Sequence, residues 1–575
     1  MRAASLLVVL LLAKTAVLWG RTPPVPVWAL AAYGWQDVAV AAAFGVWEAV
    51  LRVRASRLTG ISAAAYWALA IYAAINIPIG RVVSTPLTWP MLRAARGPLA
   101  DSMLLYVTWT NAVLVAATLM AAAILPRLLR RVPMIAATCL LPVLLVGPAA
   151  AARVDTHGMD RNVVVALIES GLPRIGAKAG AADWRASRFA GANTDDLSRL
   201  RGIAKGRNVV VISLESTAAQ YLSLYGGTPD VMPHLTELAR NALVFDNAYA
   251  VYPESIKGLF SVLCSTFPAF DSEPEAYEKV PCRPVAAVLA DAGYRTALFH
   301  SGRFAYLGME SIIRNRGYQV LEDAGDIGGN HHSSFGVDEP ATVARMLAWI
   351  DALPPGRRFF LTYLPIAGHH PYAAPDGGPF AVHSEIDQYR NALHYGDVSL
   401  GTLIEGLRAR GLEDNTLWVV YGDHGEAFGQ HTGNYGHTFF VYEENVHVPL
   451  VIAALGLLRS QQRVRRVVSL VDTAPTILDL VGLAVPAGYQ GRSILDPAPR
   501  MALFFADYSL GILGLRDGPW KFIYEIESRH RKLFRLDRDP RETEDAAGSD
   551  PARSAWYAAV LRDWSGAQKS YIASR

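Results

Sequence analysis

The chain has 575 residues, which is long for one ordinary domain, so we expect at least two units. Hydrophobic residues make up 52% of it and charged residues only 18%, and the apolar excess lies almost entirely before about residue 155. The formal net charge is only +3, and no basic stripe interleaved with aromatic residues occurs, so the composition argues against nucleic acid as a partner.

The N-terminal third has the pattern of a membrane domain. Each of its apolar segments is close to the ~20 residues that cross roughly 30 Å of hydrocarbon. We expect five spans, at about 3–20, 27–50, 60–80, 103–125 and 132–152. The first is not expected to be a cleaved signal peptide, because Lys14 interrupts it and no clear small-residue cleavage site follows. Lys14 and Asp37 are costly in lipid unless they pair, snorkel or face a cavity.

Arginine-rich loops predict the orientation of these spans. RVRASR (52–57) lies between the second and third, and RLLRR (127–131) between the fourth and fifth. Loops rich in arginine stay in the cytoplasm, so five spans would place the C-terminus outside. The arginines between residues 81 and 96 count against this orientation, in a loop that we interpret as an interfacial segment.

Three regions follow from the change in composition along the chain. We expect a transmembrane domain over 1–152, a partly helical linker over 153–205 and a globular domain over 206–575. In the last region, short β-rich runs alternate with helical patterns such as VAAVLADAG, which predicts an α/β domain with a mostly parallel central sheet. The predicted strands are NVVVISLE, ALVFDNAY, YRTALFHS, RFFLTYLP, TLWVVYGD and VPLVIAAL.

Polar side chains stand at the ends of four of these strands. They are Glu215, His300, His369 and the adjacent pair Asp423 and His424. Ligands of open α/β sheets bind beyond the carboxyl ends of the strands, so we expect these residues to gather. Carboxylates and imidazoles with a hydroxyl suit a divalent cation with one position open. Taken singly, Asp423 or Glu215 has a plain alternative as a helix N-cap.

The motifs YGDHGE and VISLEST resemble those of the alkaline-phosphatase superfamily in its sulfatase-like branch. A five-span anchor followed by such a domain is similar to lipoteichoic acid synthases and lipid A phosphoethanolamine transferases. The resemblance implies that Glu215, Asp423 and His424 bind one divalent metal ion, zinc or manganese in the first place and magnesium or calcium otherwise.

The same resemblance selects a nucleophile. In YPESIKGLFSVLCSTFP, Ser255 stands thirteen positions before Pro268, which is the family's spacing, so Ser255 is the implied nucleophile and fourth metal ligand. IKG replaces the x-P-S-R that marks sulfatases with a modified residue, so that modification is not expected. Ser216 and Thr217, beside Glu215, are the alternative hydroxyls, and helix capping is the plain role for Ser255.

Further motifs carry over residue by residue. HSGRF implies that His300 and Arg303 contact the headgroup phosphate. The H-x-P-Y pattern of GHHPY selects His369, and NYGHTFF implies His437, as acid-base and substrate-binding imidazoles. SLVDTAPTILDLVG (469–482) resembles a sulfatase signature, and we interpret it as structural turns and caps.

The globular part also holds two cysteines, Cys264 and Cys282. An exported domain can retain a disulfide, so a bond between them and chance proximity are both open.

The resemblance implies a phosphotransferase of the bacterial inner membrane with its catalytic domain on the periplasmic side. It would move phosphoethanolamine or phosphoglycerol from a membrane phospholipid to a glycan or lipid acceptor through a covalent intermediate on Ser255. A membrane-anchored sulfate- or phosphate-ester hydrolase is the main alternative, with water as the acceptor. A membrane sensor that retains the fold without catalysis is the third.

Overall fold

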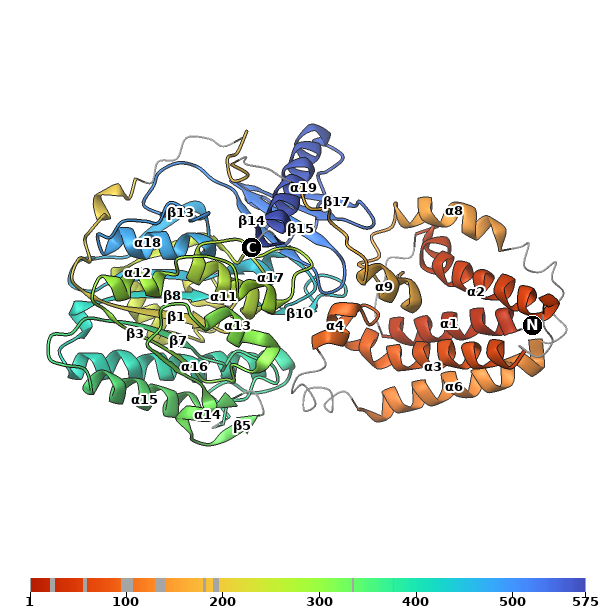
Figure 1. Ribbon diagram of the computed structural model, residues 1–575, viewed down its shortest axis with the longest axis horizontal. Coiled ribbons are helices and arrows are strands. Elements are labelled where there is room, and N and C mark those ends of the chain that lie inside the picture. The colour runs from red at the N-terminus through yellow and green to blue at the C-terminus, as the bar shows by residue number, and fades with distance from the viewer. Residues whose placement is uncertain are drawn as a thin grey trace.

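The computed structural model of the protein describes residues 2–20, 26–54, 59–94, 107–129, 140–178, 183–189, 196–333, 336–375 and 377–573. An N-terminal helical lobe and a larger α/β lobe lie side by side, with the short helix α9 (Val163–Ser170) at their junction (Figure 1).

Within the described residues, the helical lobe contains three helices that are long and apolar enough to cross a membrane, over Ala29–Val53, Gly60–Val83 and Trp109–Leu128. The first and last helices of the lobe are shorter, with 17 and 11 residues, so the prediction of five spans is not confirmed. Residues 103–106 of the fourth predicted span and 132–139 of the fifth lie outside the described residues. The helices are α1 (Arg2–Leu18), α2 (Ala29–Arg54), α3 (Thr59–Val83), α4 (Trp89–Ala94), α6 (Trp109–Leu128) and α8 (Leu141–Ala151).

Charged contacts show which ends of α1 and α2 lie together. Arg2 Nη1 and Arg52 Nη2 both contact Glu48 Oε1, at 3.3 and 2.8 Å, so the start of α1 meets the end of α2. Lys14 and Asp37, the two charges that lipid would penalise, pair with each other inside the lobe. This pairing lowers the cost of placing these two charges in lipid.

The α/β lobe is built on a nine-stranded sheet with the order β11-β2-β12-β8-β1-β7-β3-β4, in which β13 also pairs with β2. Its strands are β1 (Asn208–Leu214), β2 (Ala242–Tyr249), β3 (Arg295–His300), β4 (Val320–Glu322), β7 (Phe359–Leu364), β8 (Thr416–Gly422), β11 (His447–Val448), β12 (Leu450–Ala454) and β13 (Gln462–Ser469). All six runs predicted as strands are strands of this sheet.

The sheet is mixed, but five of its eight strand pairings are parallel, so it is mostly parallel as the sequence predicts. Strand β12 runs antiparallel to both of its neighbours, β8 and β2, and β11 runs antiparallel to β2. Parallel neighbours need a long crossover, usually a helix, whereas the one α-helix in the described segment between β8 and β12 is the short α17 (Glu443–Val446). The chain therefore turns back into the sheet after β8.

Helices cover both faces of the sheet (Figure 1). Val209 and Val211 of β1 pack into the core beneath α12 (Val285–Asp291) and α18 (Thr473–Leu480). Val210 and Ile212 pack against α15 (Glu339–Asp351) and α16 (Glu385–Ala409). Strand β1 is therefore buried on both faces, which explains its continuous apolar run.

The C-terminal part adds a second, antiparallel sheet, with β14 (Ala502–Ala506), β15 (Ile512–Asp517), β16 (Trp520–Glu525) and β17 (Arg531–Arg535) in sequence order. The long helix α19 (Pro551–Ala573) packs on it. The remaining helices of the lobe are α10 (Pro233–Leu238), α11 (Ser255–Cys264), α13 (Met309–Ile313) and α14 (Ala324–Ile327). Two further pairs of short strands are β5 (His331–Ser333) with β6 (Gly336–Val337), and β9 (Ala427–Phe428) with β10 (Tyr435–Gly436).

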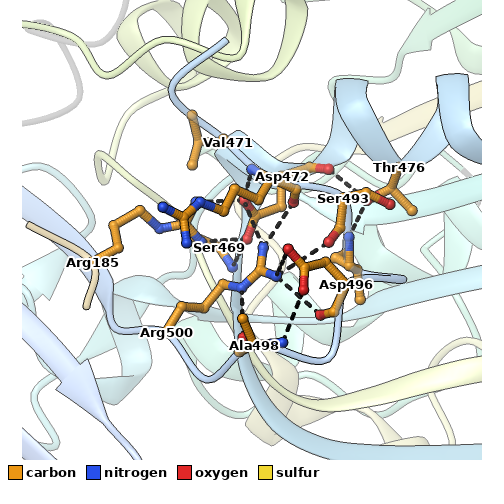
Figure 2. Close-up of polar contacts among 12 residues, drawn as sticks. Arg185, Ser469, Val471, Asp472, Thr476, Ser493, Asp496, Ala498 and Arg500 are labelled. Carbon is orange, nitrogen blue, oxygen red and sulfur yellow. Dashed lines mark hydrogen bonds and ion pairs between the residues drawn. The ribbon is translucent and has the colours of Figure 1, made fainter. Parts of the chain in front are cut away.

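A buried ion network joins this region to the linker (Figure 2). Asp472 is fully buried and accepts two hydrogen bonds of 2.6 Å from Arg185, one at each carboxylate oxygen. Arg500 lies 3.7 Å from the same carboxylate. Asp472 and Ser469 also form a capping box, and the Thr476 hydroxyl donates to the Asp472 carbonyl. These contacts fit the interpretation of residues 469–482 as structural.

Candidate active site

The register of β1 and β8 brings the first two site residues together. The strands are parallel, with Leu214 opposite Gly422, so Glu215 and Asp423 leave the sheet side by side. The Asp423 amide donates to the Leu214 carbonyl at 3.0 Å, and Asp423 Oδ1 accepts from the Ser216 amide at 3.0 Å. The carboxyl ends of two strands thus form one edge of the site, as the sequence predicts.

Close packing explains the two glycines that flank Asp423 and His424. A Cβ atom at Gly422 would lie 2.2 Å from the Thr217 carbonyl oxygen, and one at Gly425 would lie 2.1 Å from that of Glu444. Any side chain would therefore push the loop off its neighbours.

Four donor groups converge at this edge. One ligand atom each of Glu215, Asp423 and His424 lies within 4.8 Å of the others, and all three residues are buried. The Ser255 hydroxyl donates to Glu215 Oε2 at 2.9 Å and lies 3.3 Å from His424 Nε2. His424 Nδ1 donates to the Gly425 carbonyl at 3.0 Å, so its other ring nitrogen, Nε2, is the one that faces the cluster.

The electrostatics of the cluster call for a cation. Burial, together with the nearby Glu215 carboxylate, raises the pKa of Asp423 to about 7. Burial lowers the pKa of His424, but the charges of Asp423 and Glu215 more than offset this and raise it to about 10. Two buried carboxylates, an imidazole nitrogen and a hydroxyl form a donor set that fits a divalent ion.

Ser255 is the hydroxyl that faces open space. It is the first residue of α11, whose N-cap is Glu254, and Glu254 accepts the Ile256 amide at 3.1 Å. Ser255 lines a cavity of about 910 Å³, which we call the central cavity. Ser216 and Thr217, the alternative hydroxyls, are 0% and 1% exposed and are not among its lining residues.

The central cavity joins the two lobes. From the α/β lobe it is lined by Glu215, Ser255, His300, His369 and His437. From the helical lobe it is lined by Trp19, Arg81, Val83 and Asn111, near the ends of α1 and α3 and the start of α6. The cluster of donor groups therefore opens toward the helices that are apolar enough to cross a membrane.

The two predicted acid-base imidazoles lie close together, with ring centroids 6.2 Å apart. His369 Nδ1 lies 2.6 Å from the His370 carbonyl oxygen, which can only accept, so this nitrogen carries the proton. His437 Nδ1 lies 2.7 Å from Glu426 Oε2. The ring centroids of His437 and His424 are 4.2 Å apart. Both imidazoles are thus held by their Nδ1 atoms, and Nε2 is the nitrogen turned to other partners.

Glu426 and Tyr372 belong to this site but were not assigned from the sequence. The Glu426 carboxylate is buried and accepts from His437 and, at 2.7 Å, from the Tyr372 hydroxyl. Glu426 is the last residue of YGDHGE and Tyr372 ends GHHPY, so both motifs contained the signal.

Of the two residues predicted to contact the headgroup phosphate, His300 lines the cavity and Arg303 does not. His300 lines the central cavity, and its Nδ1 donates to the Leu364 carbonyl at 3.0 Å. Arg303 is half-buried, and its guanidinium lies against Gly325. Arg303 is not among the described residues that line the cavity, so the structure does not bring it to the cluster.

The structure joins Cys264 and Cys282 in a disulfide, with Cα atoms 5.5 Å apart. Cys264 is the last residue of α11, the helix that begins at Ser255. The bond therefore anchors the far end of the helix that carries the candidate nucleophile.

Comparisons with known proteins agree with this architecture. Residues 207–483 match the sulfatase family model. Lipoteichoic acid synthase 2 of Bacillus subtilis is 24% identical over 302 residues, which cover 49% of this chain and 46% of that protein. Arylsulfatase K of Canis lupus familiaris is 31% identical over 176 residues, 27% of this chain and 32% of the relative. The matches thus span about half the length of these curated relatives or less.

Among solved structures, the lipoteichoic acid synthase LtaP from Listeria monocytogenes has the same fold. The TM-score is 0.51 at 18% sequence identity, and the match covers 65% of this chain and 94% of that one. By these matches the α/β lobe resembles enzymes of the sulfatase-like phosphotransferase and hydrolase types. Residues 207–483 form a sulfatase domain of the alkaline phosphatase superfamily.

Proposed function

We propose that the protein is a metal-dependent transferase that moves a phospho-headgroup, phosphoethanolamine or phosphoglycerol, from a membrane phospholipid to a glycan or lipid acceptor through a covalent Ser255 intermediate. The central cavity carries this proposal, because Ser255 and the ends of α1 and α3 line the same space. A lipid headgroup can meet Ser255 there while its acyl chains stay beside the helical lobe. A soluble ester needs no such opening.

Glu215, Asp423, His424 and Ser255 would hold the divalent ion. When bound, the ion would lower the pKa of the serine hydroxyl and neutralise charge on the phosphate. These residues fit a divalent ion because their donor atoms are buried and converge. The hydrogen bond from His424 Nδ1 orients Nε2 of the same ring.

In the first step, Ser255 Oγ bonds to phosphorus and releases its proton along the hydrogen bond to Glu215 Oε2. The bond between phosphorus and the glyceride oxygen breaks, and the imidazolium of His437 or His369 protonates that oxygen, which leaves as diacylglycerol.

In the second step, the acceptor hydroxyl gives its proton to the same imidazole and bonds to phosphorus. Ser255 Oγ leaves phosphorus and recovers its proton from Glu215, so the site returns to its starting state. Glu426 stabilises the charged form of His437 in the first step, because its carboxylate accepts from Nδ1 at 2.7 Å.

We also propose that the α/β lobe lies outside the cytoplasm of a bacterial inner membrane. The Tyr66 hydroxyl, near the start of α3, donates to the Ala122 carbonyl near the end of α6. Arg127 in the last turn of α6 therefore lies at the same end of the lobe as Arg52. That end is the one away from the α/β lobe (Figure 1), which agrees with positively charged loops in the cytoplasm.

A membrane-anchored ester hydrolase is the second candidate, supported by the similarity to arylsulfatase K. To separate the two, the purified full chain in lipid nanodiscs is incubated with labelled phosphatidylethanolamine, labelled phosphatidylglycerol and an aryl sulfate. We expect diacylglycerol from a phospholipid and a headgroup adduct on Ser255 in the intact-protein mass spectrum. Sulfate release without turnover of either lipid would refute the transferase.

The matched variants are Ser255→Ala, Ser255→Thr and Thr217→Ala. Ser255→Ala should lose the adduct and the diacylglycerol, whereas Ser255→Thr should keep a measurable fraction because it retains a hydroxyl. Thr217→Ala should stay active, since the Thr217 hydroxyl only donates to the Glu215 carbonyl. A dead Thr217→Ala protein beside a normal Ser255→Ala protein would mean that the nucleophile is misassigned.

A further inference from the structure

A second cavity, of about 530 Å³, lies beside the central one, and we call it the side cavity. It forms where the helical lobe meets the α/β lobe, with Arg93 of α4 and Ser170 of α9 among its lining residues. Glu254 and Leu307 line both cavities. The two spaces therefore approach each other at the residue that precedes Ser255, and nothing in the proposed reaction so far uses the second one.

The lining of the side cavity has five carboxylates and three cationic side chains, and two of those three, Arg93 and Lys257, are already paired while Lys569 is the third. Arg93 pairs with Glu273, and Lys257 Nζ contacts Asp507 Oδ2 at 2.8 Å. An anionic ligand would have to compete with these carboxylates for the same cations. The cavity is therefore poorly suited to a second phosphate group.

The side cavity instead offers hydrogen-bond acceptors. Glu254 is 6% exposed, and among the described residues it has no ion-pair partner. Glu275, which is exposed at the edge of the cavity, also has no ion-pair partner among the described residues. Tyr508 adds an aromatic side chain to the lining. Carboxylates accept hydrogen bonds from hydroxyl groups, and the volume falls within the roughly 300–1,000 Å³ of small-molecule sites.

We infer that the side cavity binds the acceptor, and that the acceptor presents an uncharged polyhydroxyl group of the sugar type. The inference rests on the proposed transferase function and assigns separate places to its two substrates. The lipid donor enters through the central cavity beside the helical lobe. A sugar hydroxyl reaches the phosphorus on Ser255 from the side cavity, past Glu254, so the two substrates do not compete for one space.

The test uses the full chain in nanodiscs with the labelled phospholipid that the wild-type protein cleaves. Acceptors are a neutral β-glucan oligosaccharide and the same sugar carrying a phosphate. Ala305→Trp narrows the side cavity, because Ala305 is an exposed lining residue outside the proposed catalytic groups. Glu275→Gln is a milder second variant. Ala552→Trp, at an exposed position of α19, is the control for a surface tryptophan.

We expect Ala305→Trp to raise the KM for the neutral sugar by about tenfold or more, and Glu275→Gln to raise it less, with kcat maintained. Diacylglycerol release without acceptor should match that of the wild type and of Ala552→Trp. An unchanged KM for the sugar in Ala305→Trp, or equal use of the phosphorylated sugar, would overturn the inference. If the wild-type protein releases no diacylglycerol from any phospholipid, the proposed function itself fails.

Discussion

Removing the carboxylate of Asp472 should destabilise the α/β lobe strongly. In Asp472→Ala, the buried guanidinium of Arg185 loses two hydrogen bonds of 2.6 Å, and Arg500 loses the charge 3.7 Å away (Figure 2). Breaking a buried ion pair from one side costs about 3–5 kcal/mol, because the other charge stays buried and unpaired. At roughly 2 °C per kcal/mol for a large domain, the midpoint of thermal unfolding should fall by about 6–10 °C.

The assay is thermal and denaturant unfolding of Asp472→Ala, Arg185→Met and the double variant, followed by tryptophan fluorescence. The two single losses should not add, because each removes the same pair. A loss below about 1 kcal/mol for Asp472→Ala would refute the reasoning, since that is the range of an exposed pair. Additive losses would equally refute the pairing.

The same pair has a pH signature. Burial raises the pKa of Asp472, but the charges of Arg185 and Arg500 more than offset this, so the pKa lies below its ordinary value of 3.8. The stability that this group contributes is present above pH 3.8 and is lost as the pH falls through the lowered pKa. The stability difference between wild type and Asp472→Ala should therefore narrow in strong acid.

Three further outcomes are expected. Asp423→Ala should lose the bound divalent ion while membrane insertion is unaffected, and full metal content by elemental analysis would contradict the site. A reporter fused after Arg575 should be active only outside the cytoplasm, and a cytoplasmic signal would mean that the spans are miscounted. Glu426→Gln should lower kcat by about 10–100-fold at unchanged metal content, because it removes the charge that holds His437, and an unchanged kcat would exclude this role.

The parts of the site that strand ends define were predictable from the sequence. Runs such as NVVVISL are apolar and rich in β-branched residues, which is typical of buried strands. When two such strands are parallel, the polar residues that follow them lie at the same edge of the sheet. Glu215, Asp423 and His424 meet for that reason. The direction of β12 was not predictable, because its sequence VPLVIAAL suits a buried strand of either orientation.

Residues whose roles depend on packing between distant loops were also missed. Glu426 follows the strand end by several positions, and its function depends on where the segment around His437 folds back. Strand β13 alternates arginines with valines and reads as an exposed segment, yet it pairs with β2. Such pairings are chosen by the tertiary structure, and local pattern carries little information about them.

The charge pair in the helical lobe also contacts the segment that leads to the α/β lobe. Lys14 donates to the Asp160 carbonyl at 2.7 Å, and Asn162 Nδ2 donates to Asp37 at 2.6 Å, so the segment after α8 returns to the paired charges. The Arg161 guanidinium, between these anchors, donates to the Ser509 carbonyl of the α/β lobe at 3.3 Å. The paired charges thus hold this segment to the helical lobe, and Arg161 holds the same segment to the α/β lobe. This docking holds the ends of the membrane helices opposite the candidate nucleophile.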